Sequence, residues 1–333
     1  MQKSFLTAGL YGLVLAGGSS VMAQDAGFIW GGSVEVGIDS TVKADDPTAE
    51  VTDTYISADV AFEAAITDRI TAFGGLSLES VTDAVDNRAF EDMGLYVSEL
   101  GLRFGFGETL VSVGKISPVF GKAWDEAPGF YGTSLAEDYE LSEMIGVTVN
   151  TPLSSGVLSF AAFYVDDTAL SNSVGNKRGR NSVANGGLAN TGKFDNVSLQ
   201  FAQEFGATSA WVGLRHLTAG VGNSEDETAV AVGASHDFGT GLSMIGEVVR
   251  FDNAGGEQGY ATYTTLGGAY ALDAWTFSAT ATLVNAADST DRMYAVGVDR
   301  SLTDAIDVNF GLARFDVGGA KSTAVGLAAV VSF

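Results

Sequence analysis

Apolar and polar residues alternate with a period of two along most of the chain after about residue 27. In the first such segment Trp30, Val36 and Ile38 alternate with glycine or polar residues, and the same alternation recurs at 55–64 and 306–313. A period of two predicts β-strands whose faces meet different environments. Here one set of side chains suits lipid and the other suits water.

Short turns separate these segments. We expect them at 67–69, 105–107, 152–156, 206–208, 239–241, 272–274 and 303–305. Seven turns on one side join fourteen strands. A first strand at about 27–39 and a last strand at about 323–333 bring the number to sixteen. Bacterial single-chain barrels have an even number of strands, so the number fits a closed barrel.

The connections on the other side are longer and more polar. They are expected at 40–54, 80–93, 117–142, 166–193, 218–227, 252–259, 285–291 and 316–322. Short turns at one end and long loops at the other are typical of barrels in outer membranes. The pattern therefore predicts an all-β fold, a transmembrane antiparallel β-barrel of sixteen strands with short periplasmic turns and long extracellular loops.

The N-terminus is typical of a secretory signal peptide. Lys3 gives a positive start, an uncharged apolar run follows, and 21–23 fits a signal-peptidase site, so residues 1–23 are expected to be removed. The barrel domain is then 24–333, and it contains no apolar stretch long enough for a membrane helix. A soluble periplasmic protein remains the alternative to a barrel in the cell outer membrane, since lipid tolerates only helices and closed sheets.

Composition favours the barrel and excludes several functions. The chain has 43 Gly, 4 Pro and no Cys, and its net charge is −24. Such acidity disfavours a nucleic-acid partner, because phosphate binding needs a basic surface. His216 and His236 lie on the outward parity without converging partners, so we expect no enzymatic activity and no metal site. No cofactor is expected either.

Aromatic residues gather near the turn-side ends of the predicted strands. They are Phe62, Phe104, Phe106, Phe205, Phe238, Tyr270, Trp275 and Phe333. Rings at this level form the interfacial girdle of membrane barrels. The terminal Phe333, preceded by alternating apolar positions, resembles the recognition signal of outer-membrane barrel assembly, which implies the barrel-assembly machinery as a partner.

The stretch 101–151 carries the most specific motifs. A Gly-Leu-Arg-Phe-Gly segment at 101–105 leads to Gly114-Lys115, then a long loop containing Pro128 and Phe130, and then a new strand from Met144. This arrangement resembles the general porin family of outer membranes. The resemblance implies that the third loop, about 117–142, folds into the lumen, and that Lys115 stands where the family has an arginine of the basic wall. It also implies a homotrimer, which the small residues at 324–329 would suit.

The expected site is a constriction of the lumen. Its acidic side is formed by loop residues Asp125, Glu126, Glu137, Asp138 and Glu140, and its basic wall by Arg103 and Lys115. Opposed acids and bases would create a transverse field, and an excess of acids favours cations. Inward parity adds further acids along the strands. The chain is therefore expected to be a water-filled channel for diffusion of small hydrophilic solutes and ions, with a preference for cations.

Two other functions remain open. One is a substrate-specific or ligand-binding barrel for a sugar, phosphate or chelated metal, and the other is a structural barrel with a plugged lumen. The expected partners also include outer-membrane lipid and lipopolysaccharide, whose phosphates could meet a basic cluster at 177–180 in the fourth long loop.

Overall fold

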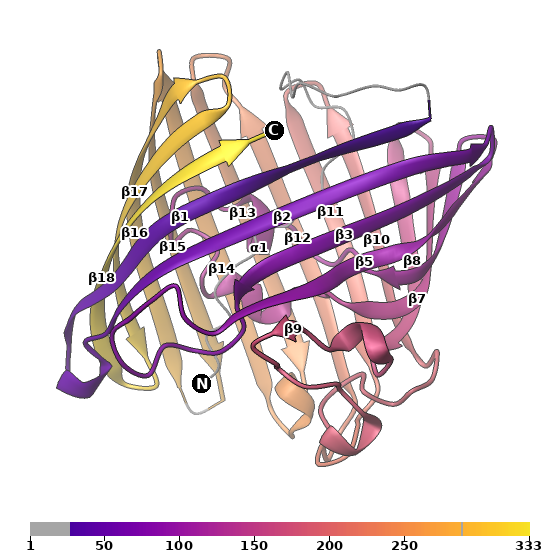
Figure 1. The fold of residues 1–333 in the computed structure, drawn as a ribbon, viewed down its shortest axis with the longest axis horizontal. Helices are drawn as coiled ribbons and strands as arrows, with labels where there is room; N and C mark the ends of the chain where they lie inside the picture. The colour runs from indigo at the N-terminus through magenta and orange to yellow at the C-terminus, as the bar shows by residue number, and fades with distance from the viewer. Residues whose placement is uncertain (1–26, 288) are drawn as a thin grey trace.

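Sixteen antiparallel strands form a closed ring in the computed structural model, which describes residues 27–287 and 289–333 (Figure 1). The wall strands are β1 Phe28–Ala44, β2 Thr52–Thr67, β3 Ile70–Ser80, β5 Met93–Phe106, β6 Thr109–Ile116, β7 Met144–Leu153, β8 Gly156–Val165, β10 Asn196–Phe205, β11 Thr208–Leu217, β12 Glu227–Asp237, β13 Leu242–Asp252, β14 Tyr260–Leu272, β15 Trp275–Ala286, β16 Thr290–Thr303, β17 Ile306–Val317 and β18 Ala320–Ser332. The predicted signal peptide, 1–23, lies outside the described residues.

The remaining elements lie in the long connections. They are the 3-10 helix η1 Pro47–Ala49, the two-residue strand β4 Arg88–Ala89, the short helix α1 Ala123–Glu126, and η2 Ala136–Tyr139, η3 Ala169–Ser171, β9 Val174–Gly175, η4 Val183–Asn185 and η5 Ala254–Gly256. β4 pairs in parallel with β2, and β9 pairs with the loop-side end of β5. None of the described helices is long and apolar enough to cross a membrane.

Each wall strand pairs with its neighbours in sequence, and the ring closes where β1 meets β18. This seam runs from Ser33↔Ser332 to Ala44↔Ser322. At its turn-side end the backbone of Phe333 exchanges two hydrogen bonds with Gly32, at 2.9 and 3.0 Å. Closure leaves the wall without a free edge, which satisfies the backbone groups that lipid cannot hydrogen bond.

All seven predicted turns are confirmed, because each falls at the junction of two consecutive wall strands. Two of the predicted long loops are wrong in extent. Only 287–289 separate β15 from β16, and the connection expected at 316–322 is a two-residue turn of Gly318 and Gly319. Both glycines have positive φ, +60° and +78°, which a tight hairpin turn requires. The polar residues beside them, Asp316 and Lys321, pair within the strands.

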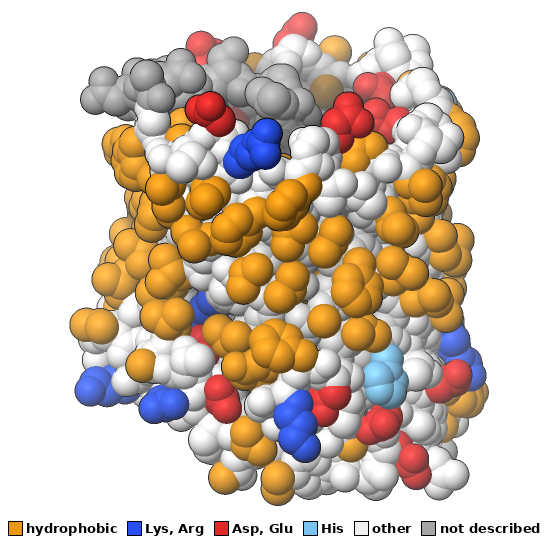
Figure 2. Space-filling view, turned by 90° about the vertical axis from the view of Figure 1, so that its right-hand side faces the viewer, with side chains coloured by type: hydrophobic (Ala, Val, Ile, Leu, Met, Phe, Trp, Pro, Cys, Tyr) orange, Lys and Arg blue, Asp and Glu red, His pale blue; other side chains and the backbone are white. Residues whose placement is uncertain are grey.

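The outer surface carries a band of apolar side chains between two charged rims (Figure 2). The predicted aromatic girdle lies largely on this surface: Phe106 is 65 % exposed, Phe205 59 % and Phe238 48 %, whereas Phe62 and Phe104 are half-buried. Contact of such a band with water would be unfavourable, because each exposed ring would have to be hydrated. Its presence fits a barrel surrounded by lipid.

The inner face differs from the polar surface that alternation predicted. On β13, Glu247 shares this face with Ile245, Val249 and Phe251, all of them buried. These apolar residues do not meet water, because the third long loop packs against them. The lumen therefore contains a hydrophobic core of its own.

Candidate functional site

The third long loop, residues 117–143 between β6 and β7 and called loop 3 below, crosses the interior of the barrel. Its short helix α1 lies behind β1–β3 in Figure 1, inside the ring of strands. α1 contacts both η2 and β13. This location agrees with the loop expected at about 117–142.

A single buried carboxylate anchors loop 3 to the wall. Glu247 accepts hydrogen bonds from the backbone N–H groups of Lys122 and Ala123, at 2.8 and 3.0 Å. It also accepts bonds from the Tyr139 hydroxyl at 2.6 Å and from the Trp211 indole at 2.5 Å. Four donors satisfy the charge that burial would otherwise penalise. Both short helices of the loop thus attach to one side chain of β13.

Further anchors follow along the loop. The amide oxygen of Gln200 accepts from the N–H of Gly121 at 2.7 Å. The hydroxyl of Thr280 donates to the carbonyl of Pro128 at 2.8 Å. The Tyr131 hydroxyl donates to Asp39 at 2.5 Å. Loop 3 therefore follows the inner face from β10 through β15 to β1.

A row of glycines makes room for this path. Gly297, Gly311 and Gly326 are register partners on β16, β17 and β18. A Cβ atom at Gly326 would lie 2.1 Å from the ring of Phe130, and one at Gly311 would lie 2.6 Å from the Phe130 Cβ. The small residues at 324–329 were interpreted as suited to a trimer contact. Gly326 contacts loop 3, and Ala324 and Ala328 are buried, whereas Leu327 and Ala329 are exposed on the outer face.

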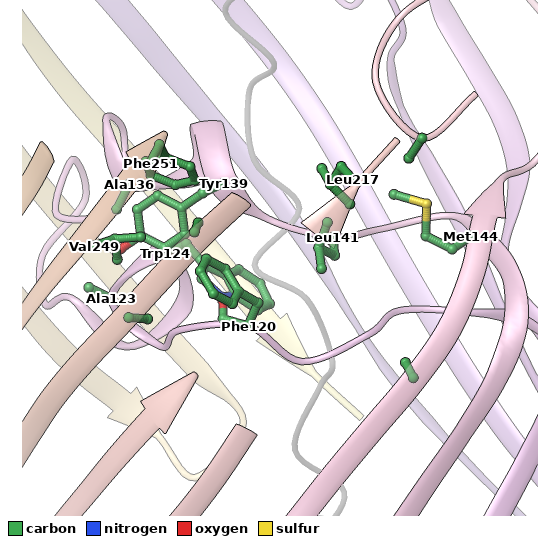
Figure 3. Close-up of a cluster of buried hydrophobic side chains, with 14 of the residues drawn as sticks. Phe120, Ala123, Trp124, Ala136, Tyr139, Leu141, Met144, Leu217, Val249 and Phe251 are labelled. Atoms are coloured by element: carbon green, nitrogen blue, oxygen red, sulfur yellow. The ribbon is translucent and has the colours of Figure 1, made fainter. Parts of the chain in front are cut away.

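Aromatic packing holds the middle of loop 3. Phe120, Trp124 and Tyr139 pack with Val249 and Phe251 of β13 in the cluster of Figure 3. The Phe120 and Tyr139 rings meet edge to face with centroids 6.4 Å apart. Burial of each of these large side chains contributes a few kcal/mol. The cluster therefore stabilises loop 3 in its position against the wall.

The predicted acidic residues divide into two groups. Asp125, Glu126 and Asp138 are exposed to the lumen side, whereas Glu137 and Glu140 are half-buried. Glu126 forms an ion pair with Lys122 at 2.9 Å. Asp138 accepts a hydrogen bond from the Tyr263 hydroxyl of β14 at 3.0 Å, and Glu137 accepts one from Thr133. The five carboxyls therefore do not form one uniform acidic surface.

The pKa values of several of these carboxyls are raised above their ordinary range. The Asp125 side chain is accessible to water, but surrounding protein inside the barrel partly desolvates its carboxyl, and this desolvation, reinforced by the charge of Glu126, raises the pKa of Asp125 to about 6. Burial also raises the pKa of Glu140 to about 7, with Asp125 as the next contributor, and that of Glu137 to about 8 against the hydrogen bond from Thr133. Near neutral pH the loop therefore carries less negative charge than its composition suggests.

The predicted basic wall is reduced to one partly exposed residue. Arg103 is 33 % exposed at its side chain and pairs with Glu63 at 2.5 Å. Lys115 has no exposed side-chain surface: it pairs with Glu143 at 2.5 Å and Asp166 at 3.1 Å. The interpretation of Lys115 as a lumen-facing charge was therefore wrong. Desolvation is tolerated because two carboxylates and the Leu170 carbonyl surround its ammonium.

A basic residue that sequence reasoning set aside lies beside the acids. Arg178, from the fourth long loop, residues 166–195, binds both carboxylate oxygens of Glu143, at 2.7 and 2.5 Å. Its guanidinium also stacks 3.9 Å from the centroid of the Tyr96 ring. The cluster at 177–180 was interpreted as a contact for the phosphates of lipopolysaccharide. No local pattern indicates that Arg178 turns inward, because its partners are 35 and 82 residues away.

An open space remains between loop 3 and the opposite wall. This cavity of about 530 Å³ is lined by residues from β1, β2, β3, β5 to β8 and β10, including Ile116 at the end of β6, together with Ser117 and Val119 at the start of loop 3. Apolar side chains make up the larger part of this lining, and the charged groups Glu63, Glu99 and Arg103 lie among them.

Comparison with known proteins identifies the family of this chain. A family model described as Gram-negative porin matches residues 10–320. The chain belongs to the Gram-negative porin family. A search of curated protein sequences gives no significant match.

Solved structures show the same fold as this porin at low sequence identity. An anion-selective porin from Comamonas acidovorans is 13 % identical with a TM-score of 0.59, covering 92 % of this chain and 99 % of that one. A mutant of the Rh. blastica porin is 17 % identical with a TM-score of 0.62, covering 92 % and 100 %. A loop-deletion mutant of OmpT from Vibrio cholerae is 14 % identical with a TM-score of 0.62, covering 93 % and 100 %.

Family membership and architecture together locate this porin. A closed sixteen-stranded barrel with an apolar outer band and a loop-lined interior belongs in the outer membrane. This porin is therefore an outer-membrane channel protein.

Proposed function

We propose that this porin passes small hydrophilic solutes and ions by passive diffusion, without catalysis, and prefers cations. The observation that carries the proposal is the excess of carboxyls without a basic partner over unpaired bases along loop 3. Asp125, Asp138 and Glu140 form no ion pair with a described residue, whereas Lys122 pairs with Glu126. A channel lined by more free acids than bases concentrates cations.

The bases of the interior support the same direction. Arg103 is neutralised by Glu63, and Lys115 is fully buried between Glu143 and Asp166. Arg215, also on the inner face, is buried against Glu227 at 2.6 Å and stacks between Phe120 and Phe251. Arg103 joins wall strands, whereas Lys115 and Arg215 join the wall to the long loops. All three are paired and leave little positive charge facing water. We propose that the constriction consists of Asp125, Glu126, Glu137, Asp138 and Glu140 opposite Arg103.

The test is the reversal potential of the purified, folded channel in a planar bilayer under a KCl gradient. A sign that corresponds to faster K⁺ than Cl⁻ supports the proposal, and the preference should shrink as salt screens the charges. Arg103→Gln should strengthen the preference for K⁺, and Asp125→Asn should weaken it. A potential of anion-selective sign in the wild-type channel would overturn cation preference, and absence of conductance would overturn the channel function.

The porin family also supports a homotrimer as the assembled form. Of the two further candidates, a substrate-specific channel would show saturable block of conductance by its ligand, and a plugged barrel would show no conductance. Sugars and phosphate should leave the ion current of a general diffusion channel unchanged at concentrations where a binding channel saturates.

A further inference from the structure

The lipid-facing surface contains a groove near the turn-side ends of β15, β16 and β17. The groove has a volume of about 390 Å³ and is lined by Trp275, Val298, Arg300, Leu302, Val308 and Phe310. Five of the six lining side chains are apolar. Trp275 begins β15 and Arg300 lies near the end of β16, so the groove starts at the aromatic girdle and extends toward the middle of the apolar band.

Strand register explains how the groove forms. Trp275, Arg300 and Val308 are partners in one row across the three strands, and Phe277, Val298 and Phe310 form the next row toward the middle of the barrel. The register between β16 and β17 shifts between Ser301 and Thr303, which leaves Leu302 as a bulged residue at the groove's outer end. A bulge re-aims the side chains beside it and interrupts the even surface of the sheet.

Arg300 places a positive charge in this apolar setting. It is exposed, and its guanidinium lies 4.7 Å from the centroid of the Trp275 ring. No carboxylate of residues 27–287 and 289–333 forms an ion pair with it. In a chain with 41 acidic residues and 17 basic ones, an outward-facing arginine without an acidic partner leaves its five N–H donors available to a ligand.

We propose that this groove binds one anionic glycerophospholipid of the turn-side leaflet. The phosphate accepts hydrogen bonds from the Arg300 guanidinium, which matches a phosphate in a bidentate manner. An acyl chain lies along Val298 and Phe310, and Trp275 holds the guanidinium at headgroup level. Each part of the ligand thus meets a complementary part of one continuous groove.

The test uses the purified full-length porin in detergent, with phosphatidylglycerol or zwitterionic phosphatidylethanolamine added. Native mass spectrometry counts the lipids retained on the folded protein. We expect preferential retention of phosphatidylglycerol, and a reduction of about five-fold in that preference for Arg300→Gln. Arg250→Gln is the control for loss of an exposed arginine, because Arg250 also stacks 4.1 Å from a ring centroid, that of Tyr260, but lies at the opposite rim with Asp252 as an acidic partner at 3.7 Å.

A second measurement places the lipid. Phosphatidylglycerol with brominated acyl chains should quench the fluorescence of Trp275 at lower lipid concentration than the phosphatidylethanolamine equivalent does, and the difference should vanish in Trp275→Phe. Equal retention by the Arg300→Gln and Arg250→Gln proteins would overturn the proposal. Loss of the oligomer in Arg300→Gln without any change in lipid retention would also overturn it, because the groove would then be a contact between copies of the chain.

Discussion

The carboxylate of Glu247 joins α1, η2 and β11 at one point, through the N–H of Ala123, the Tyr139 hydroxyl and the Trp211 indole. Alternation along β13 places this residue on the inner face. It could not reveal the partners, because they lie 36 to 125 residues away. The same limit applied to Lys115, because Glu143 lies at the far end of loop 3, 28 residues away, and Asp166 lies in the fourth long loop.

Glu247→Gln should loosen loop 3 without unfolding the barrel. A glutamine offers one acceptor oxygen, and its NH₂ group donates where the loop also donates, so at least one buried N–H loses its partner. The expected loss of stability is about 1–3 kcal/mol. Single-channel records should become noisier, and the thermal unfolding midpoint should fall.

The control for this variant is Glu204→Gln. Glu204 is exposed on the inner face of β10. The substitution removes the same charge, but it removes no hydrogen bond to loop 3. If both variants increase current noise equally, the effect arises from the lost charge, and Glu247 is not the anchor.

At the level of elements, strand placement followed from alternation and turn chemistry, whereas loop conformation did not. The seven turns were found because each is short and interrupts two alternating segments. The turn at Gly318 and Gly319 was mistaken for part of a longer loop, because polar residues at strand ends resemble loop residues. The path of loop 3 depends on the glycine row. A local sequence pattern cannot predict this row, because it forms only through the register between β16, β17 and β18.

Substitution at this glycine row tests the path of loop 3. In Gly326→Ala the added Cβ would meet the Phe130 ring at 2.1 Å, so the loop must move away from β18 and into the lumen. Such overpacking costs about 1–3 kcal/mol, and single-channel conductance should fall. The double variant Gly326→Ala with Phe130→Ala removes the clash and should recover conductance. A double variant that stays as low as the single one would contradict this explanation.

Loop 3 should also make selectivity depend on pH. Asp125, Glu140 and Glu137 have pKa values raised to about 6, about 7 and about 8, chiefly by burial. Since these values exceed those of the unfolded chain, the folded loop holds extra protons and ionises as pH rises. Preference for K⁺ should therefore increase between about pH 5 and pH 9, while the same ionisation lowers stability.

Reversal potentials measured across this pH range, at constant KCl gradient, check the prediction. Glu137→Gln should remove the part of the change that occurs near pH 8 and leave the lower part intact. A wild-type reversal potential that is constant from about pH 5 to pH 9 would show that these carboxyls do not face the ion path.

For the whole molecule, Phe333 extends the seam that closes the barrel at its turn-side end. The Phe333 backbone exchanges two hydrogen bonds with Gly32, and its ring lies 5.6 Å from that of Trp30. Because β18 and β1 are last and first in the sequence, these contacts form only when all other strands are present. Deletion of Phe333 removes both the backbone pair and the ring, whereas Phe333→Ala retains the backbone pair alone.

Assembly into lipid, followed by the fraction of heat-modifiable folded barrel over time, should therefore slow for Phe333→Ala and slow further for the deletion. Phe205→Ala serves as the control, since Phe205 is a girdle ring that is 59 % exposed and lies away from the seam. If Phe205→Ala slows assembly as much as Phe333→Ala, the ring acts through the membrane interface in general. An effect confined to residue 333 in cells but absent in purified lipid would instead assign the terminal ring to recognition by the barrel-assembly machinery.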